Sequence, residues 1–280
     1  MKKITILMLA VCSIFAVLNT AHAQDDERHF LIISYKTIMP DGGSAAERDS
    51  LESIFTEAVI RKNDKILSQQ SMQHYYGPDS RDWIVVRECA SWADLDAARL
   101  ENRRLRRETW PDQVERRAFF KELNKYWLPM HGDEVYVGLD KFEKHATQMP
   151  SADENHIFTM NTTKITRPDG GSVARRDSLL TLEHEAITMK NDKIISQRIL
   201  THRYGSDRRD WITVTEYAKW EDIAEAATMS RNLRRERWPD EAERSALRDE
   251  VDSYFLLQHS DQIYTGLSKF EKRPAQMTAK

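Results

Sequence analysis

The chain has 280 residues, of which 42 are Lys or Arg and 45 are Asp or Glu, and its formal net charge is -3 at pH 7. This mildly acidic balance argues against a nucleic-acid-binding protein, which normally presents a basic surface. The two cysteines are Cys12 and Cys89. Since we expect Cys12 to be removed during export, the core has to be stable without an intramolecular disulfide.

The first residues have the pattern of a secretory signal peptide. Lys2 and Lys3 give a basic start, residues 4–18 are mainly apolar, and residues 21–23 supply the small side chains that a signal peptidase requires. We therefore expect residues 1–23 to be a signal peptide and the mature protein to be exported, either periplasmic or secreted. The apolar stretch is shorter than the roughly 20 residues that span a bilayer, and no later stretch is longer, so no transmembrane segment is predicted.

The rest of the chain is a tandem repeat. A shift of 128 residues aligns residues 30–149 with residues 158–277 without a gap, and about half of the paired positions are identical. The recurring motifs are PDGGS at 40–44 and 168–172, NDKI at 63–66 and 191–194, RDWI at 81–84 and 209–212, WPD at 110–112 and 238–240, and KFEK at 141–144 and 269–272. We assign residues 24–149 to the first repeat, 150–155 to a short polar linker and 156–280 to the second repeat.

Periodicity predicts the same elements in each repeat. Within the first, PDGGS indicates a turn, and Ser44 with Glu47 forms a capping-box pattern at a helix start. Residues 77–79 (GPD) indicate a hairpin loop between two antiparallel strands, and Pro111 is expected in the first turn of a new helix. The predicted order is strand 30–37, helix 44–64, strands 66–76 and 83–89, helices 92–110 and 111–126, and strand 135–139.

This order, βαββααβ, is that of a ferredoxin-like unit with a split βαβ arrangement, and the fold class is α+β. Such a sheet carries helices on one face only, so its other face needs a cover. The second copy can provide that cover. We therefore expect two tandem ferredoxin-like units to form an intramolecular dimeric α/β barrel. A monomer is then sufficient to close the barrel, and a homo-oligomer is the alternative.

Element order and duplication are also features of a known group of proteins. Together with the stretches DWIVVRECASWADLDAA at 82–98 and DWITVTEYAKWEDIAEA at 210–226, they give a chain that resembles the dimeric α/β barrel superfamily. That superfamily includes antibiotic-biosynthesis monooxygenases, NIPSNAP-like proteins and, as fused tandem copies, chlorite dismutase-like proteins. The resemblance implies that the protein could be an enzyme. Similar barrels host cofactor-independent oxygenases that act on electron-rich rings, and tandem versions host haem chemistry.

Strand alternation predicts which side chains face the barrel interior. In the third strand of the first repeat we expect Ile84 and Val86 to meet the helices, so that their neighbours point inward. A similar assignment for the second and last strands brings histidines and tyrosines to the same interior. The predicted ligand-binding residues are His74, Tyr76, Trp83, Arg87, Tyr136, His202, Tyr204, Trp211 and Tyr264. The alternative is that these aromatic side chains only fill the space between the sheets.

Two other groups of residues could bind a metal or a ligand, but their patterns favour structural roles. His131 with Asp133, and His259 with Asp261, precede the last strands, but their spacing is too common to specify a metal site, and a turn role is favoured. The arginines of residues 103–107 are followed by a glutamate, which favours a solvated ion-pair surface over a binding patch.

The functional hypothesis is an exported small-molecule-binding protein with a pocket between the two sheets, whose ligand is small and apolar or aromatic. Two alternatives stay open. One is an enzyme of the cofactor-independent monooxygenase or haem-dependent type, with His74 or His202 as base or axial ligand. The other is a structural or partner-binding module.

Overall fold

The computed structural model describes residues 29–39, 42–146 and 154–274. The predicted signal peptide and residues 150–153 of the predicted linker lie outside the described residues. None of the helices in the described ranges combines the length and the apolar composition needed to cross a membrane.

Both repeats have the element order predicted from the sequence. The first contains β1 (Phe30–Thr37), α2 (Ala45–Phe55) with a π-helical end η2 (Thr56–Ile60), β2 (Ser68–Tyr76), β3 (Asp82–Cys89), α3 (Trp92–Thr109), α4 (Gln113–Asn124), β4 (Gly132–Gly138) and η3 (Asp140–Phe142). The second contains β5 (Ile157–Ile165), α5 (Val173–Glu183) with η4 (His184–Thr188), β6 (Ser196–Tyr204), β7 (Asp210–Tyr217), α6 (Glu221–Arg237), α7 (Glu241–Asp252), β8 (Phe255–Gly266) and η5 (Ser268–Phe270).

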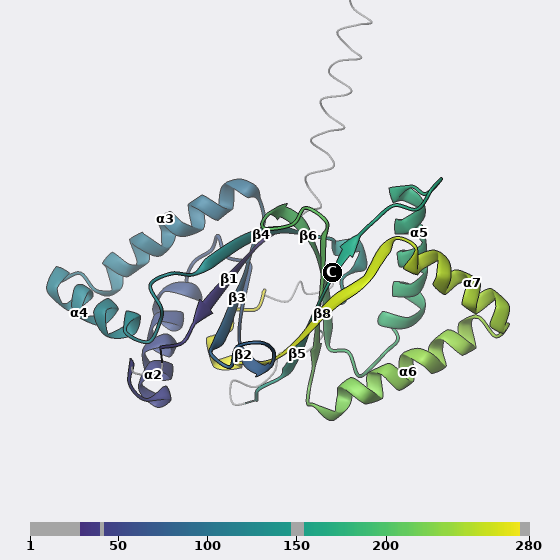
Figure 1. Cartoon of the computed structure of the whole chain (residues 1–280). Helices are drawn as coiled ribbons and strands as arrows, with labels where there is room; N and C mark the ends of the chain where they lie inside the picture. Colours follow the sequence, from purple (N-terminus) through teal and green to yellow (C-terminus); the bar gives the residue numbers. More distant parts are fainter. Residues whose placement is uncertain (1–28, 40–41, 147–153, 275–280) are drawn as a thin grey trace, which may run out of the picture.

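The strands form one closed barrel in the order β1-β3-β2-β8-β5-β7-β6-β4. All strand pairs are antiparallel, and the repeats join twice, through β2 with β8 and through β4 with β6. The predicted intramolecular barrel is therefore confirmed, as a single closed sheet in which no strand edge of either repeat is left unpaired. Helices α2 to α4 lie outside the barrel on one side and α5 to α7 on the other (Figure 1).

Local sequence signals explain where the helices begin. The predicted capping box is present, because the Ser44 side chain accepts a hydrogen bond from the backbone N–H of Glu47 and the Glu47 carboxylate accepts one from that of Ser44. Helix α4 begins at Gln113, two positions later than predicted. Asp112 caps it through its side chain, so Pro111 precedes the cap instead of lying in the first turn.

The NDKI motif ties the end of each first helix to the next helix. Asn63 is fully buried, and its amide donates to the carbonyl of Ala98 and to Asn102, both at 2.8 Å, while its oxygen accepts from the backbone N–H of Lys65. In the second repeat Asn191 makes the matching contacts. The recurrence of this asparagine thus has a structural cause.

The interior of the barrel is a packed apolar core, and it reverses the prediction made for the third strand. Ile84 and Val86 are buried inside the barrel, together with Tyr136 and Tyr264. Trp83, Arg87 and, in the second repeat, Trp211 consequently face the helices, so their predicted inward orientation is wrong. The inward orientation predicted for the two tyrosines agrees with the structure.

The physical reason is the closure of the sheet. The inside of a closed barrel is filled by side chains, so it takes mainly apolar ones such as Ile84 and Val86, together with the rings of Tyr136 and Tyr264. Beneath the helices there is room for Trp and Arg, whose long apolar parts pack while their polar ends reach other partners.

The first strands show that the two repeats do not align without a gap. Ile84 pairs with Tyr35 in β1, but its counterpart Ile212 pairs with Thr162 in β5, one residue earlier than the shift of 128 requires. The second repeat therefore has one more residue between its first strand and its first helix. Leu31 and Ile33 are matched inside the barrel by Phe158 and Met160.

Candidate functional site

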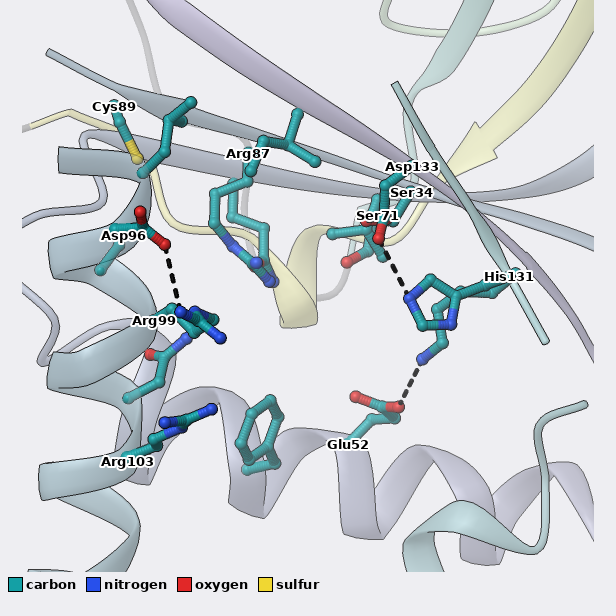
Figure 2. A pocket seen from close by; sticks show the side chains of 18 of the residues that line it. Ser34, Glu52, Ser71, Arg87, Cys89, Asp96, Arg99, Arg103, His131 and Asp133 are labelled. Atoms are coloured by element: carbon teal, nitrogen blue, oxygen red, sulfur yellow. Dashed lines mark hydrogen bonds and ion pairs between the residues drawn. The ribbon is translucent and has the colours of Figure 1, made fainter. Parts of the chain in front are cut away.

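A cavity lies between the outer face of the sheet and helices α2 and α3 of the first repeat (Figure 2). Its volume is about 580 Å³, within the range of ligand pockets. The predicted pocket had been placed between the two sheets, where the structure instead has the packed core. The candidate site is thus on the opposite face of the same strands.

Apolar side chains form much of the cavity wall. Trp83 lies at the sheet side and packs edge-on against Trp127, with ring centroids 5.1 Å apart. The remaining apolar lining residues come from β1, β3 and the two helices, and they are Ile32, Phe55, Val85, Cys89, Leu95 and Ala98. A flat ring of moderate size fits such surroundings. The thiol of Cys89 stays protonated at neutral pH, because burial raises its pKa to about 11.

Arg87 brings a cation into this apolar space. Its side chain extends from β3 into the cavity toward helix α3 (Figure 2). The guanidinium donates through Nε and Nη2 to the Gln69 side-chain oxygen, at 3.1 and 2.8 Å. Among the described residues it has no carboxylate within ion-pair distance. Burial lowers the pKa of Arg87.

Two further arginines of α3 line the cavity. Arg106 lies over the rings of Phe55 and Phe120, with its guanidinium carbon 5.0 and 4.6 Å from the ring centroids. Its Nε atom is buried and has no hydrogen-bond partner in the described part of the chain. Burial, followed by the charges of Arg87 and Arg103, lowers the pKa of Arg106. The predicted solvated ion-pair surface is therefore wrong for Arg106, which is partly buried in the cavity wall, whereas Arg103 lines the same cavity but is exposed.

The other lining cations have acidic partners. Lys36 Nζ lies 3.6 Å from a Glu52 oxygen and over the ring of Trp127. Arg99 Nη2 lies 3.3 Å from an Asp96 oxygen. After these two ion pairs are counted, the side chains that line the cavity still carry a net positive charge.

At the edge of the cavity an imidazole is paired with a carboxylate. His131 Nε2 lies 3.2 Å from Asp133 Oδ2, and both side chains are about half exposed. The Ser34 hydroxyl donates to the other Asp133 oxygen at 2.6 Å, so the carboxylate is fixed from both sides. Because Nε2 faces the carboxylate, Nδ1 is the ring nitrogen left for another partner. His131 thus has the geometry of an oriented general base, a role the sequence analysis did not assign to it.

Most of the predicted ligand-binding residues do not line the cavity. Of that set, only Trp83 and Arg87 do. Tyr136 and Tyr264 are inside the barrel, where their hydroxyls donate to Glu134 and Gln262. Trp211 packs against Phe255 and Phe142 under the helices of the second repeat.

The other four lie at the ends of β2 and β6. Tyr76 is 60% exposed and contacts Trp220 of the other repeat, and Tyr204, 59% exposed, contacts Trp92 in the same way. His74 and His202 occupy the same strand ends, away from the cavity.

The positions of the histidines bear on whether the protein could bind haem or a metal ion. Neither His74 nor His202 lines the cavity, so the residues proposed as axial ligands do not fit a haem there. Within the described ranges no group of three or more His, Cys, Asp or Glu side chains is arranged to hold a metal ion.

The positions equivalent to Arg87 and Cys89 carry different side chains in the second repeat. Thr215 stands where Arg87 does, and it accepts a hydrogen bond from Gln197, the counterpart of Gln69. The buried ring of Tyr217 occupies the position of Cys89. Such divergence in charge and size between equivalent positions is the sequence signal that could have located the cavity.

Comparisons with known proteins support the fold. No family model and no curated protein matches the chain. Among solved structures, a Fusobacterium nucleatum protein named "putative monooxygenase" has a TM-score of 0.54 and 7% identity, covering 85% of this chain and 92% of that one. A Lactobacillus acidophilus protein of the same name has a TM-score of 0.52 and 10% identity, covering 86% and 94%.

The chain therefore has the fold of the dimeric α/β barrel superfamily, with both halves of the barrel in one polypeptide. Solved structures named as chlorite dismutases are also similar, for example one with a TM-score of 0.49 and 9% identity over 87% of this chain. At these identities the likeness concerns the fold alone.

Proposed function

We propose that this chain is an enzyme of the cofactor-independent monooxygenase type, which oxidises a small ring compound in the cavity of the first repeat. The observation that carries the proposal is the His131–Asp133 pair at the edge of an apolar cavity large enough for such a compound. The two structures named as monooxygenases, both with TM-scores above 0.5, support this choice among barrel functions.

The proposed reaction needs a base and a substrate carbon that is readily deprotonated. His131 Nδ1 takes a proton from an activated CH2 group, and Asp133 stabilises the resulting imidazolium through Nε2. The substrate carbanion then reduces O2. Overall, CH2 and O2 become C=O and H2O, the substrate supplies all four electrons, and the two hydrogens leave in the water.

Oxygen uptake tests this proposal. The mature protein is incubated in air-saturated buffer with tricyclic ketones that carry an activated CH2 group, such as anthrone, and the rise in uptake over the buffer rate is measured. His131→Gln is expected to lower the protein-dependent rate about 100-fold, within the usual range for loss of a general base.

The second repeat offers a matched control. His259 is paired with Asp261 at 3.1 Å, and Asp261 accepts from Asn161, so the carboxylate contacts match those of His131 but lie outside the cavity. His259 Nδ1 lies 3.2 Å from the carbonyl oxygen of Leu257, so this nitrogen also has a partner. His259→Gln should leave the rate unchanged. Equal rates for His131→Gln and His259→Gln would contradict the assignment of His131 as base.

We also propose that the protein is exported, on the evidence of the predicted signal peptide. Expression of the full chain in a bacterial host should yield a periplasmic or secreted product that begins near residue 24. N-terminal sequencing of that product would identify the cleavage site, and an unprocessed cytoplasmic product would contradict export.

A further inference from the structure

The cavity lining carries a net positive charge, because its Lys and Arg side chains outnumber Glu52, Asp96 and Asp133. Arg87, Arg103 and Arg106 line the cavity, and none of them has a described carboxylate within ion-pair distance. Arg106 also has a buried Nε atom without a described hydrogen-bond partner. Like charges gathered in a partly dry space repel one another, so an anion bound among them would be strongly favoured.

The duplicated repeat provides an internal comparison. Arg234, the counterpart of Arg106, is neutralised by Glu183 at 3.0 Å. In the first repeat Phe55 stands in place of that glutamate, and Arg87 stands in place of Thr215. At the positions of Arg87 and Arg106 the first repeat therefore has one cation more and one acidic partner fewer than the second. It also has Glu52 and Asp96 where the second has Leu180 and Ala224, but these carboxylates pair with Lys36 and Arg99. Arginines without a described ion-pair partner at these two positions are thus particular to the first repeat, which indicates a site for an anion.

Arg87 is held in an orientation that suits a carboxylate. Nε and Nη2 each donate one hydrogen to Gln69, which uses two of the five N–H groups of the guanidinium. The edge formed by Nη1 and the second hydrogen of Nη2 is left for another acceptor. That edge can donate two parallel hydrogen bonds, the geometry that a carboxylate accepts.

We propose that the cavity binds an aromatic carboxylate, whose carboxylate group accepts hydrogen bonds from Arg87 and whose ring lies against Trp83 and Leu95. The inference rests on the proposed function only in taking this cavity as the active site. Arg103 and Arg106 add long-range attraction for the anion, and Gln69 is a positioning residue that holds Arg87.

Isothermal titration calorimetry with two probes of the same shape tests the inference. The full mature protein is titrated with 2-naphthoate, an anion, and with 2-naphthamide, its neutral analogue. We expect naphthoate to bind more tightly than naphthamide. Arg87→Gln should weaken naphthoate binding about 10- to 100-fold, the effect of losing hydrogen bonds to a charged group, and leave naphthamide binding unchanged.

Two controls separate this effect from net charge and from misfolding. Arg231→Gln removes the exposed counterpart of Arg103 on α6, outside the cavity, and should change naphthoate binding less than twofold. Retained naphthamide binding by Arg87→Gln shows that the cavity is intact. If neither probe binds, if both bind equally, or if Arg87→Gln binds naphthoate as the wild type does, the inference is overturned.

The outcomes also distinguish this inference from the proposed function. Oxygen uptake that depends on His131, combined with no preference for naphthoate over naphthamide, would overturn the carboxylate inference and leave the enzyme in place. Naphthoate binding that depends on Arg87, combined with no oxygen uptake for any probe, would support the anion site and overturn the oxidation.

Discussion

Glu143 follows β4 and lies at the end of the barrel with only 8% of its surface exposed. Burial raises the pKa of its carboxyl from 4.5 to about 7, and the nearby charges of Glu88 and Asp140 act in the same direction. Arg198 and His29 act in the opposite direction but do not outweigh these effects. The folded protein therefore holds this proton more tightly than the unfolded chain does.

The sign of the pH dependence follows from this difference. A group whose pKa is raised on folding contributes stability below its unfolded pKa, here about 4.5, and the contribution is lost as the pH rises through about 7. The gap between the two values corresponds to about 3 kcal/mol. Glu143→Gln, which cannot ionise, should therefore gain about 3 kcal/mol of unfolding free energy over the wild type between pH 4 and pH 8.5.

Urea unfolding at these two pH values measures the difference, and taking wild type minus variant cancels the other titrating groups. Glu236→Gln, an exposed residue of α6, serves as the control and should show no pH-dependent difference. If the difference between Glu143→Gln and the wild type changed by less than about 0.5 kcal/mol between pH 4 and pH 8.5, the assigned ionisation of Glu143 would be refuted.

Two more predictions concern contacts that join the elements. Arg198 of β6 pairs with Glu88 of the first repeat at 2.9 Å, with both side chains nearly buried. Arg198→Met should cost about 3 kcal/mol in urea unfolding, because Glu88 loses its arginine and keeps only Ser68 and His29 as partners. Arg175→Met breaks the exposed pair with Glu250 and should cost at most about 1 kcal/mol, and equal losses would contradict the difference in burial. Asn63→Ala should destabilise the protein by about 1–3 kcal/mol, because it removes the hydrogen bonds of a fully buried side chain to Ala98, Asn102 and Lys65, and Asn191→Ala should do so to a similar extent. A clear effect of only one of these two variants would contradict the shared role of the asparagines.

The repeat made the architecture predictable from the sequence, because two copies of one pattern limited the choice of element order. Motifs with a local structural cause were placed correctly, as for the capping box at Ser44. The register of the first strand was not predictable. Phe30 and Lys36 coincide with Phe158 and Lys164 at the shift of 128, and these identities concealed the extra residue that the strand pairing reveals.

The facing of β3 was wrong for a different reason. Both faces of this strand carry large side chains, with Ile84 and Val86 on one and Trp83 and Val85 on the other, and alternation cannot decide between two buried faces. The choice depends on closure of the sheet, which is set by strands far away in the chain. Because the facing of β3 was reversed, the pocket was predicted inside the barrel, whereas the cavity lies on the helix side of the sheet.

The same duplication that concealed the register gives the best account of why the cavity is where it is. Equivalent positions in the two repeats occupy the same places in the fold, and even core positions differ, as Leu31 and Phe158 do. Differences that change the charge or the room at the cavity are the informative ones. Tyr217 is buried where Cys89 leaves room, and Arg234 is neutralised where Arg106 is not. At these two positions the first repeat thus keeps room and an arginine without a described acidic partner, where the second repeat has a tyrosine ring and an ion pair. Cys89→Tyr, which copies the second repeat at one position, should accordingly fill the site and abolish naphthoate binding without unfolding the protein.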